Sequence, residues 1–324
     1  MPQTRTRKTL VPELNKIRLA MLGMVDGNGH PYSWSAIFNG YDEAAMANCP
    51  YKAIPDYLDK EPKDKLQIAG ARVTHIWTDN PHDAEDVARC SKIPNIVARP
   101  EDVIGKVDAV IIATDKGHEH IARCRPFVEA GLPIFVDKPL VDTYEDLAVF
   151  RRWVDTGAAI MSSSCMRYAK EFAPFRASTN DLGALRYLSI TTPKTWERYG
   201  IHALEAAYPL LGPGFDEVYN TGTRDRNIVH FIHESGADLV VAATSDMYGS
   251  FGVLSICGTK GHAQVSFHDT FFAFKAQLQA FVDYLRTGVR PFPFSETVEL
   301  MKMVVAGIMS REESGKMVRL ADLP

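Results

Sequence analysis

The tripeptide Asp137-Lys138-Pro139 places a lysine directly after the apolar run of residues 132–136, at the carboxyl end of a predicted buried strand. In open α/β sheets, ligands bind in the crevice outside the carboxyl ends of the strands, so this lysine is expected to face a binding site. Partial desolvation and a neighbouring positive charge both disfavour an ammonium, which brings a lysine into the range useful for general acid/base chemistry. The tripeptide alone leaves a solvated surface lysine as the alternative, because most lysines are solvated.

The elements that must position this lysine alternate between strand and helix along the first half of the chain. Predicted strands cover residues 17–23, 72–78, 107–114 and 158–165, and predicted helices cover residues 81–90, 119–130 and 144–155. The run at 107–114 is continuous and apolar, as expected of a strand that is covered on both faces. This alternation predicts an N-terminal doubly wound parallel sheet, a Rossmann-like α/β fold.

The second half of the chain has a different pattern, in which short β-type segments follow one another with turn residues between them. These segments are residues 185–191, 217–219, 228–233, 238–244, 252–257 and 262–267, and the predicted helices are 202–211, 274–287 and 295–315. The pattern predicts a C-terminal α+β domain with a mainly antiparallel sheet. Because single cores usually stop growing at ~250–300 residues, we expect two domains. We place a dinucleotide-binding domain at residues 1–166 and a substrate-binding and oligomerisation domain at residues 167–324.

Composition excludes several classes of function. The formal net charge of -4 and the lack of a legible basic face argue against a nucleic-acid partner. No run is long enough to cross a membrane, and the basic start is not followed by the apolar stretch of a signal peptide. The five cysteines are scattered without a CxxC pair, which fits reduced thiols in a cytoplasm and argues against a metal site. We expect a cytoplasmic protein that acts on a small molecule.

A glycine-rich loop follows the first predicted strand, with Gly23, Gly27 and Gly29 before a helix that has Pro31 in its first turn. Backbone N–H groups there could hold a pyrophosphate at the positive end of the helix dipole. The spacing is G-x3-G-x-G rather than GxGxxG, and a tight turn without a ligand explains the same glycines about equally well.

Asp79 is the expected acid for the adenosine ribose hydroxyls, and its carboxylate would repel a 2′-phosphate, which favours NAD over NADP. Asp79 lies 56 residues after Gly23, against the usual ~20, so an insertion is expected, most plainly at residues 41–65. A helix-start role ahead of Pro81 has similar weight.

Two motifs carry a resemblance to a known family. Residues 108–114 with 117–120 resemble the strand and loop that pass under the nicotinamide ribose in the Gfo/Idh/MocA family, the oxidoreductases named after glucose-fructose oxidoreductase and inositol dehydrogenase. Residues 130–139 resemble that family's Glu-Lys-Pro signature, with Asp137 in place of glutamate. Further similar segments are residues 166–168, 200–205, 258–261 and 313–316, so the resemblance runs through nearly the whole chain.

The resemblance implies hydride transfer between nicotinamide and a carbinol carbon of a sugar, a polyol or a sugar acid. Lys138 would be the primary proton-transfer residue, and His202 would assist it, since an imidazole can donate or accept at neutral pH. A buried helix histidine is the alternative for His202. The implied cofactor contacts, besides the glycine loop and Asp79, are Thr114, His118, His120, Asp137, Lys138 and Pro139. The resemblance also implies a homo-oligomer, and a substrate contact from Arg167.

One departure from the family pattern stands out. The family usually has an aspartate four residues before the histidine, where this chain has Arg198. A cation there would lower the pKa values of both Lys138 and His202, and its guanidinium could bind a carboxylate of an anionic substrate. We interpret residues 192–198 as a specificity loop, in which Lys194 contacts the substrate and Trp196 is a sugar-stacking platform. Packing of Trp196 between domains has equal weight.

Three hypotheses of function remain. The first is an NAD-dependent dehydrogenase of a sugar, polyol or sugar acid. The second is an enzyme that retains NAD and uses transient oxidation to drive elimination or glycoside cleavage. The third is a nucleotide-binding protein without catalysis.

Overall fold

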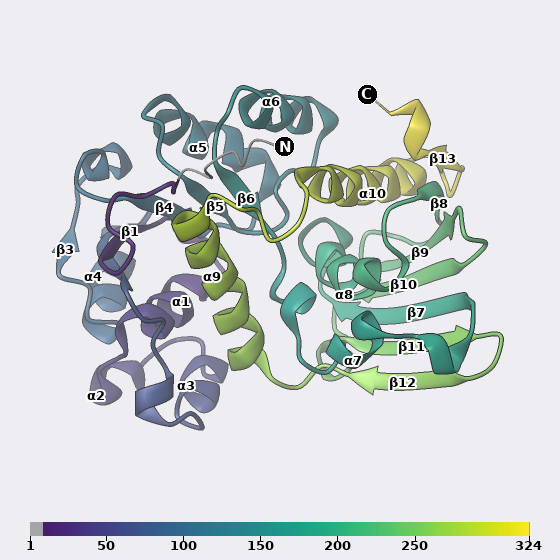
Figure 1. Cartoon of the computed structure of the whole chain (residues 1–324), viewed down its shortest axis with the longest axis horizontal. Coiled ribbons are helices and arrows are strands. Elements are labelled where there is room, and N and C mark those ends of the chain that lie inside the picture. Colours follow the sequence, from purple (N-terminus) through teal and green to yellow (C-terminus); the bar gives the residue numbers. More distant parts are fainter. Residues whose placement is uncertain (1–8, 324) are drawn as a thin grey trace, which may run out of the picture.

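The computed structural model describes residues 9–323, and its elements are built around two sheets (Figure 1). The first sheet has six parallel strands in the order β3-β2-β1-β4-β5-β6. They are β1 (Ile17–Leu22), β2 (Ala71–Trp77), β3 (Asn95–Ile96), β4 (Ala109–Ile112), β5 (Ile134–Val136) and β6 (Ile160–Ser162). The strand order reverses between β1 and β4, which creates a crevice at their carboxyl ends. The predicted doubly wound sheet is confirmed.

Helices cover both faces of this sheet. Helices α1 (His30–Asn39) and α4 (Pro81–Cys90) lie on one face, and α5 (His120–Glu129) and α6 (Tyr144–Asp155) lie on the other (Figure 1). All residues of β4 and β5 are buried between these layers. The near-continuous apolar sequence of β4 follows from this burial on both faces.

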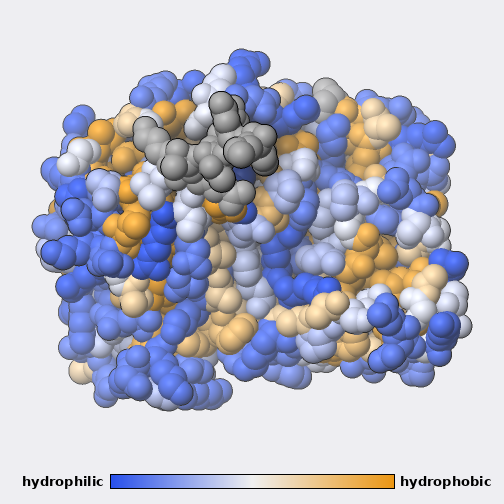
Figure 2. Space-filling model, viewed as in Figure 1, coloured by the Kyte–Doolittle hydropathy of each residue, from blue (hydrophilic) through white to orange (hydrophobic). Residues whose placement is uncertain are grey.

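The predicted insertion is a small helical layer between α1 and β2. It contains α2 (Glu43–Met46), α3 (Ala53–Leu58) and a 3-10 turn (Lys63–Lys65). Its outer side is mainly hydrophilic (Figure 2). In α1, every residue from Pro31 to Asn39 is buried, because the helix has the sheet on one side and other helices on the other.

The second sheet has seven strands in the order β12-β11-β7-β10-β9-β8-β13. They are β7 (Leu185–Pro193), β8 (Phe215–Asn220), β9 (Arg226–His233), β10 (Asp238–Thr244), β11 (Val253–Gly258), β12 (His262–Ser266) and β13 (Val318–Arg319). The pair of β7 and β10 is parallel and every other pair is antiparallel. The predicted α+β domain with a mainly antiparallel sheet is confirmed.

Four further helices connect or cover the two sheets. They are α7 (Ala173–Ala177), α8 (Ile201–Leu211), α9 (Thr270–Thr287) and α10 (Phe294–Glu312). Helix α8 packs against β7, and α10 packs against β8 and α6. Helix α9 returns to the first sheet, where the rings of Phe281 and Phe135 are 5.5 Å apart. The chain beyond residue 167 therefore helps to cover the first domain, and the predicted boundary stays a prediction.

Within residues 9–323, no helix is both long and apolar enough to cross a membrane. The same residues contain no group of three or more His, Cys, Asp or Glu side chains placed to hold a metal ion.

Candidate active site between the two domains

Lys138 lies two residues after the end of β5, at the carboxyl end of the first sheet, as predicted. Its side chain is only 3% exposed, and its Nζ is 3.6 Å from Oδ2 of Asp115. Burial lowers the pKa of Lys138, but the carboxylates of Asp137 and Asp115 outweigh burial and raise the pKa above its ordinary value. Lys138 is therefore an ammonium at neutral pH.

Arg198 lowers the pKa of Lys138 as expected, but the carboxylates of Asp137 and Asp115 outweigh this effect, so the net direction is upward. Its Nη2 is 2.7 Å from Oδ1 of Asp115, and its Nε is 3.2 Å from Oδ2 of the same residue. Burial raises the pKa of Asp115, but Lys138 and Arg198 together hold it at about 2. The guanidinium is thus compensated by a carboxylate that the sequence interpretation did not include, and its capacity for a substrate carboxylate is already used.

His202 lies in the first turn of α8, in the second domain, and is 4% exposed. Its Nδ1 is 2.7 Å from the hydroxyl of Ser164. Burial lowers the pKa of His202 well below its ordinary value, and the charge of Lys138 adds to this effect. The imidazole is therefore neutral at pH 7. The predicted lowering is confirmed for this residue, although burial and Lys138 cause it rather than Arg198.

Tyr199 brings the groups of the two domains together. Its ring centroid is 5.1 Å from Nζ of Lys138 and 4.7 Å from the ring of His202. Its hydroxyl accepts a hydrogen bond of 2.8 Å from Nζ of Lys194, and that Nζ is also 3.4 Å from the carbonyl oxygen of Gly27. The predicted specificity loop therefore reaches the glycine-rich loop. Residues 196–200 form a π-helical turn, a feature frequent at functional sites.

Asp137 is fully buried, and three donors hold its carboxylate. They are Nδ2 of Asn28 at 2.9 Å, Nδ1 of His30 at 2.6 Å and the backbone N–H of Lys138 at 2.7 Å. Burial raises the pKa of Asp137, but the charges of His30 and Lys138 bring it below the ordinary value. The carboxylate therefore ties the start of α1 to the end of β5.

The glycine-rich loop serves more than one purpose. Gly23 has φ +86°, and a Cβ there would lie 2.7 Å from Cγ2 of Thr114, so the loop passes closely over the end of β4. Gly27 also has a positive φ, of +75°. A Cβ at Gly29 would instead lie 2.7 Å from the ring of Tyr51. Gly29 is thus required by packing against the insertion.

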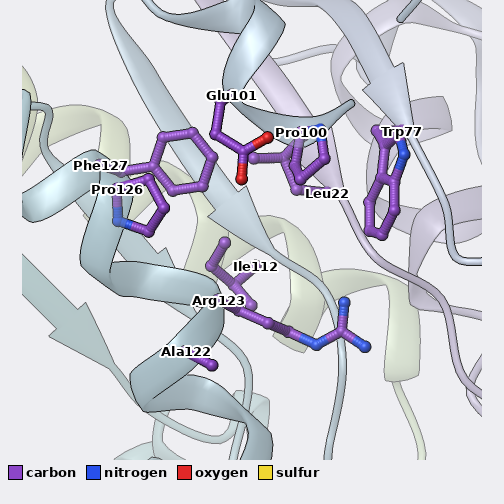
Figure 3. A pocket seen from close by; sticks show the side chains of 9 residues that line it. All are labelled: Leu22, Trp77, Pro100, Glu101, Ile112, Ala122, Arg123, Pro126 and Phe127. Carbon is purple, nitrogen blue, oxygen red and sulfur yellow. The ribbon is translucent and has the colours of Figure 1, made fainter. Parts of the chain in front are cut away.

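The residues around Asp79 fit the adenosine half of NAD. One Asp79 oxygen accepts a hydrogen bond from the backbone N–H of Met24, and the other accepts one of 2.7 Å from Arg123. The side chain that caps α4 is Asn80, so the helix-start interpretation of Asp79 is wrong. A cavity of about 200 Å³ lies beside Arg123, with mainly apolar side chains from β1, β2, β4 and α5 around it (Figure 3).

A second observation also fits a dinucleotide. Oγ1 of Thr114 is buried and has no hydrogen-bond partner among the described residues. It lies where the glycine-rich loop crosses β4, so a ligand atom there would complete its hydrogen bonding.

Two predicted substrate residues are placed elsewhere by the structure. Trp196 is fully buried, and its Nε1 donates a hydrogen bond of 2.8 Å to the carbonyl of Val304 in α10. It packs inside the second domain, so the sugar-stacking interpretation is wrong. The guanidinium of Arg167 is bound by Glu205 and Glu296. Arg167 joins two helices of the second domain and does not join the Lys138 cluster, contrary to the expectation.

The two histidines of the loop after β4 differ. His120 is fully buried, and its ring nitrogens are 2.9 and 2.8 Å from the carbonyl oxygens of Leu140 and Thr114. The ring therefore connects two loops, and both of its nitrogens are occupied. A direct contact between His120 and a cofactor is not supported. His118 is 62% exposed beside Asp142. His118 lines a groove of about 480 Å³ that opens at the Asp115–Arg198 pair.

Sequence interpretation missed four residues of the site: Asn28, His30, Asp115 and Tyr199. Asp115 had a usable signal, since it is a polar residue directly after a buried strand, as Lys138 is. Asn28 and His30 lie within or next to the glycine-rich loop but were treated only as loop residues. Tyr199 gave no signal, because its role depends on the turn that precedes α8.

Comparisons with known proteins agree with this geometry. Residues 51–157 match the model of the Gfo/Idh/MocA group, described as "Oxidoreductase family, NAD-binding Rossmann fold". The matched residues include Asp79, Asp115 and the segment 137–139, and they begin after the glycine-rich loop. No curated protein matches the chain.

Solved structures show the same fold over nearly the whole chain. A probable dehydrogenase from Thermotoga maritima matches with TM-score 0.74 and 15% identity, over 95% of this chain and 100% of that one. An oxidoreductase from Agrobacterium radiobacter in complex with NAD+, L-tartaric acid and magnesium matches with TM-score 0.73 and 15% identity, over 95% and 100%.

The scyllo-inositol dehydrogenase from Lactobacillus casei with bound NAD(H) and scyllo-inositol matches with TM-score 0.73 and 13% identity, over 94% of this chain and 99% of that one. At these identities the likeness concerns the fold. The family match over residues 51–157 shows that this part of the chain, which carries β2 to β5, is similar to the NAD-binding Rossmann domain of the Gfo/Idh/MocA oxidoreductases.

Proposed function

We propose that the protein is an NAD-dependent dehydrogenase that transfers a hydride between nicotinamide and a carbinol carbon of a sugar, a polyol or a sugar acid. The observation that carries the proposal is the meeting of Lys138 and His202, from different domains, at the ring of Tyr199. One is a buried ammonium and the other is a buried neutral imidazole, so the site holds a proton donor and a proton acceptor at the same pH.

The two groups take complementary roles. The Lys138 ammonium donates a hydrogen bond to the substrate oxygen and stabilises the negative charge that develops on it. His202 accepts the hydroxyl proton through Nε2, because its Nδ1 is engaged with Ser164. The O–H electron pair then forms the carbonyl bond. The bound nicotinamide supplies the hydride acceptor in this direction. Lys138 thus acts as the acid, and His202 rather than Lys138 acts as the base in oxidation.

Two charged groups guide the choice of cofactor and substrate. Asp79 disfavours a 2′-phosphate, which supports NAD over NADP. Lys194 is half-buried beside Tyr199 and has no carboxylate within ion-pair distance among the described residues. Sugar acids therefore remain among the expected substrates, because an anionic group of a substrate could pair with the Lys194 ammonium.

A substrate screen tests the proposal. Polyols, aldoses and uronates, with scyllo-inositol and L-tartrate because solved neighbours bind them, are incubated with NAD or NADP, and the absorbance of the reduced cofactor is followed. We expect stoichiometric reduction of added NAD by at least one substrate, at a rate lower by about 100-fold or more with Lys138→Ala. Turnover without net reduction would indicate the NAD-retaining alternative, and a strong preference for NADP would contradict the role of Asp79.

A further inference from the structure

His30 is the first residue of α1 and directly follows the glycine-rich loop. Its Nδ1 is 2.6 Å from Oδ2 of the buried carboxylate of Asp137. An ionised carboxylate only accepts hydrogen bonds, so Nδ1 must carry the proton. The other ring nitrogen, Nε2, has no hydrogen-bond partner among the described residues. A carboxylate that fixes one nitrogen of an imidazole leaves the other nitrogen oriented for a ligand.

The ring of His30 is fixed in place on two further sides. It stacks on Trp34 with centroids 4.3 Å apart and an angle of 18° between the planes, and it meets the edge of Phe274 at 5.1 Å. The His30 side chain is 15% exposed. Nδ1 and one face of the ring are therefore covered, and part of the side chain stays exposed.

The surroundings of His30 are those of the candidate site. Asn28 accepts a hydrogen bond from the backbone N–H of His30 and donates one to Asp137. His30 also lies close enough to Asp115 and His202 to affect their ionisation. The start of α1 is therefore held over the ends of β4 and β5, where dinucleotide phosphates bind in sheets of this kind.

We propose that His30 is a cofactor contact, with Nε2 accepting a hydrogen bond from a hydroxyl of the nicotinamide ribose of NAD. Asp137 acts through His30 as a positioning residue. The inference rests on the proposed function, because it requires that the protein binds NAD. It adds a contact that the glycine spacing does not contain and gives a reason for the departure of this loop from GxGxxG. The alternative is that His30 serves only to pack against Trp34.

Two matched variants separate these roles. His30→Asn places an amide nitrogen near the position of Nδ1 and keeps the bond to Asp137, but has nothing at Nε2. His30→Gln places an amide oxygen near Nε2. NADH binding is measured by fluorescence titration, with thermal unfolding as the check of folding. We expect His30→Asn to weaken NADH about tenfold or more, which corresponds to about 1.4 kcal/mol. His30→Gln should weaken it less.

Chemical modification of the wild-type protein gives a second readout that packing alone would not move. Diethyl pyrocarbonate modifies accessible histidines, and peptide mass spectrometry identifies each one. We expect NADH to protect His30 but not His82, which is 87% exposed in the first turn of α4. Wild-type NADH affinity in His30→Asn, or no protection of His30, would overturn this inference while wild-type NADH binding still supported the proposed function. A wild-type protein that binds no NADH would overturn both.

Discussion

Arg198 of the second domain and Asp115 of the first domain form a forked ion pair, in which Nη2 and Nε of the arginine are 2.7 and 3.2 Å from the two carboxylate oxygens. The same carboxylate lies 3.6 Å from Nζ of Lys138. One buried carboxylate therefore compensates two cations, one from each domain. This arrangement connects the position of the second domain to the protonation state of Lys138.

Asp115→Asn should lower the pKa of Lys138. The change removes one of the two carboxylates that raise the pKa of Lys138 and leaves only Asp137 against burial and Arg198, so the pKa falls. We expect the alkaline limb of the kcat/KM profile to move to lower pH and activity at neutral pH to fall about tenfold or more, since charge stabilisation in a buried site is large. The measurement is the pH dependence of NAD reduction.

Asp142→Asn is the matched control for this change. Asp142 lines the same groove and pairs with the exposed His118, but it does not contact Lys138. Its variant should keep the wild-type pH profile. An unchanged profile in Asp115→Asn would show that Asp115 does not set the protonation of Lys138.

Asp79→Ser should change cofactor preference. The carboxylate that repels a 2′-phosphate is removed, and Arg123 loses its 2.7 Å bond to Asp79 while it keeps Glu119, so one side of its guanidinium can bind that phosphate. We expect the ratio of kcat/KM for NADP to that for NAD to rise about 100-fold. Addition of Arg123→Ala should remove most of the gain. A ratio that is the same in wild type and Asp79→Ser would place the adenosine ribose elsewhere.

His202 should make the fold less stable in mild acid. The pKa of the folded-state imidazole lies well below its ordinary value of ~6.5, so between these values the unfolded chain binds a proton that the folded chain does not. The stability contribution is therefore present above pH ~6.5 and is lost as the pH falls below it. Urea unfolding at pH 7.5 and 5.0 should show a larger loss for wild type than for His202→Gln. An equal loss in both proteins would mean that His202 is protonated in the folded state.

Gly307→Ala should destabilise the protein, although alanine is the better helix former. Gly307 lies inside α10, and a Cβ there would be 2.6 Å from Nε1 of Trp196. Overpacking of this kind costs about 1–3 kcal/mol, against a gain of about 1 kcal/mol from helix propensity. We expect a lower thermal midpoint. A higher midpoint would show that Trp196 can move away without cost.

The local sequence pattern was enough to predict the fold, because strands buried on both faces and helices with capping signals can be recognised from short segments of sequence. Helices α4 and α6 have the predicted bounds, and β10 does as well. The junction at Lys138 was also predictable, since a strand end in a parallel sheet points to the ligand crevice. The insertion followed from the long separation of Gly23 and Asp79.

The errors at the site come from partners distant in sequence. The effect of Arg198 could not be predicted from residues 192–198, because its partner Asp115 lies 83 residues earlier. Trp196 resembles a surface platform in sequence, but Gly200 and Gly307 leave room for its ring inside the domain. Arg167 is likewise bound by Glu296, which lies in α10 and is distant in sequence.

The central claim is that Lys138 handles the substrate oxygen beside bound NAD. The most direct measurement compares wild type and Lys138→Ala in NADH affinity and in the rate of NAD reduction with the best substrate of the screen. The account predicts nearly unchanged NADH binding and a rate lower by about 100-fold or more, as expected for the loss of a group that transfers or shares a proton. A Lys138→Ala enzyme that reduces NAD at the wild-type rate would contradict it.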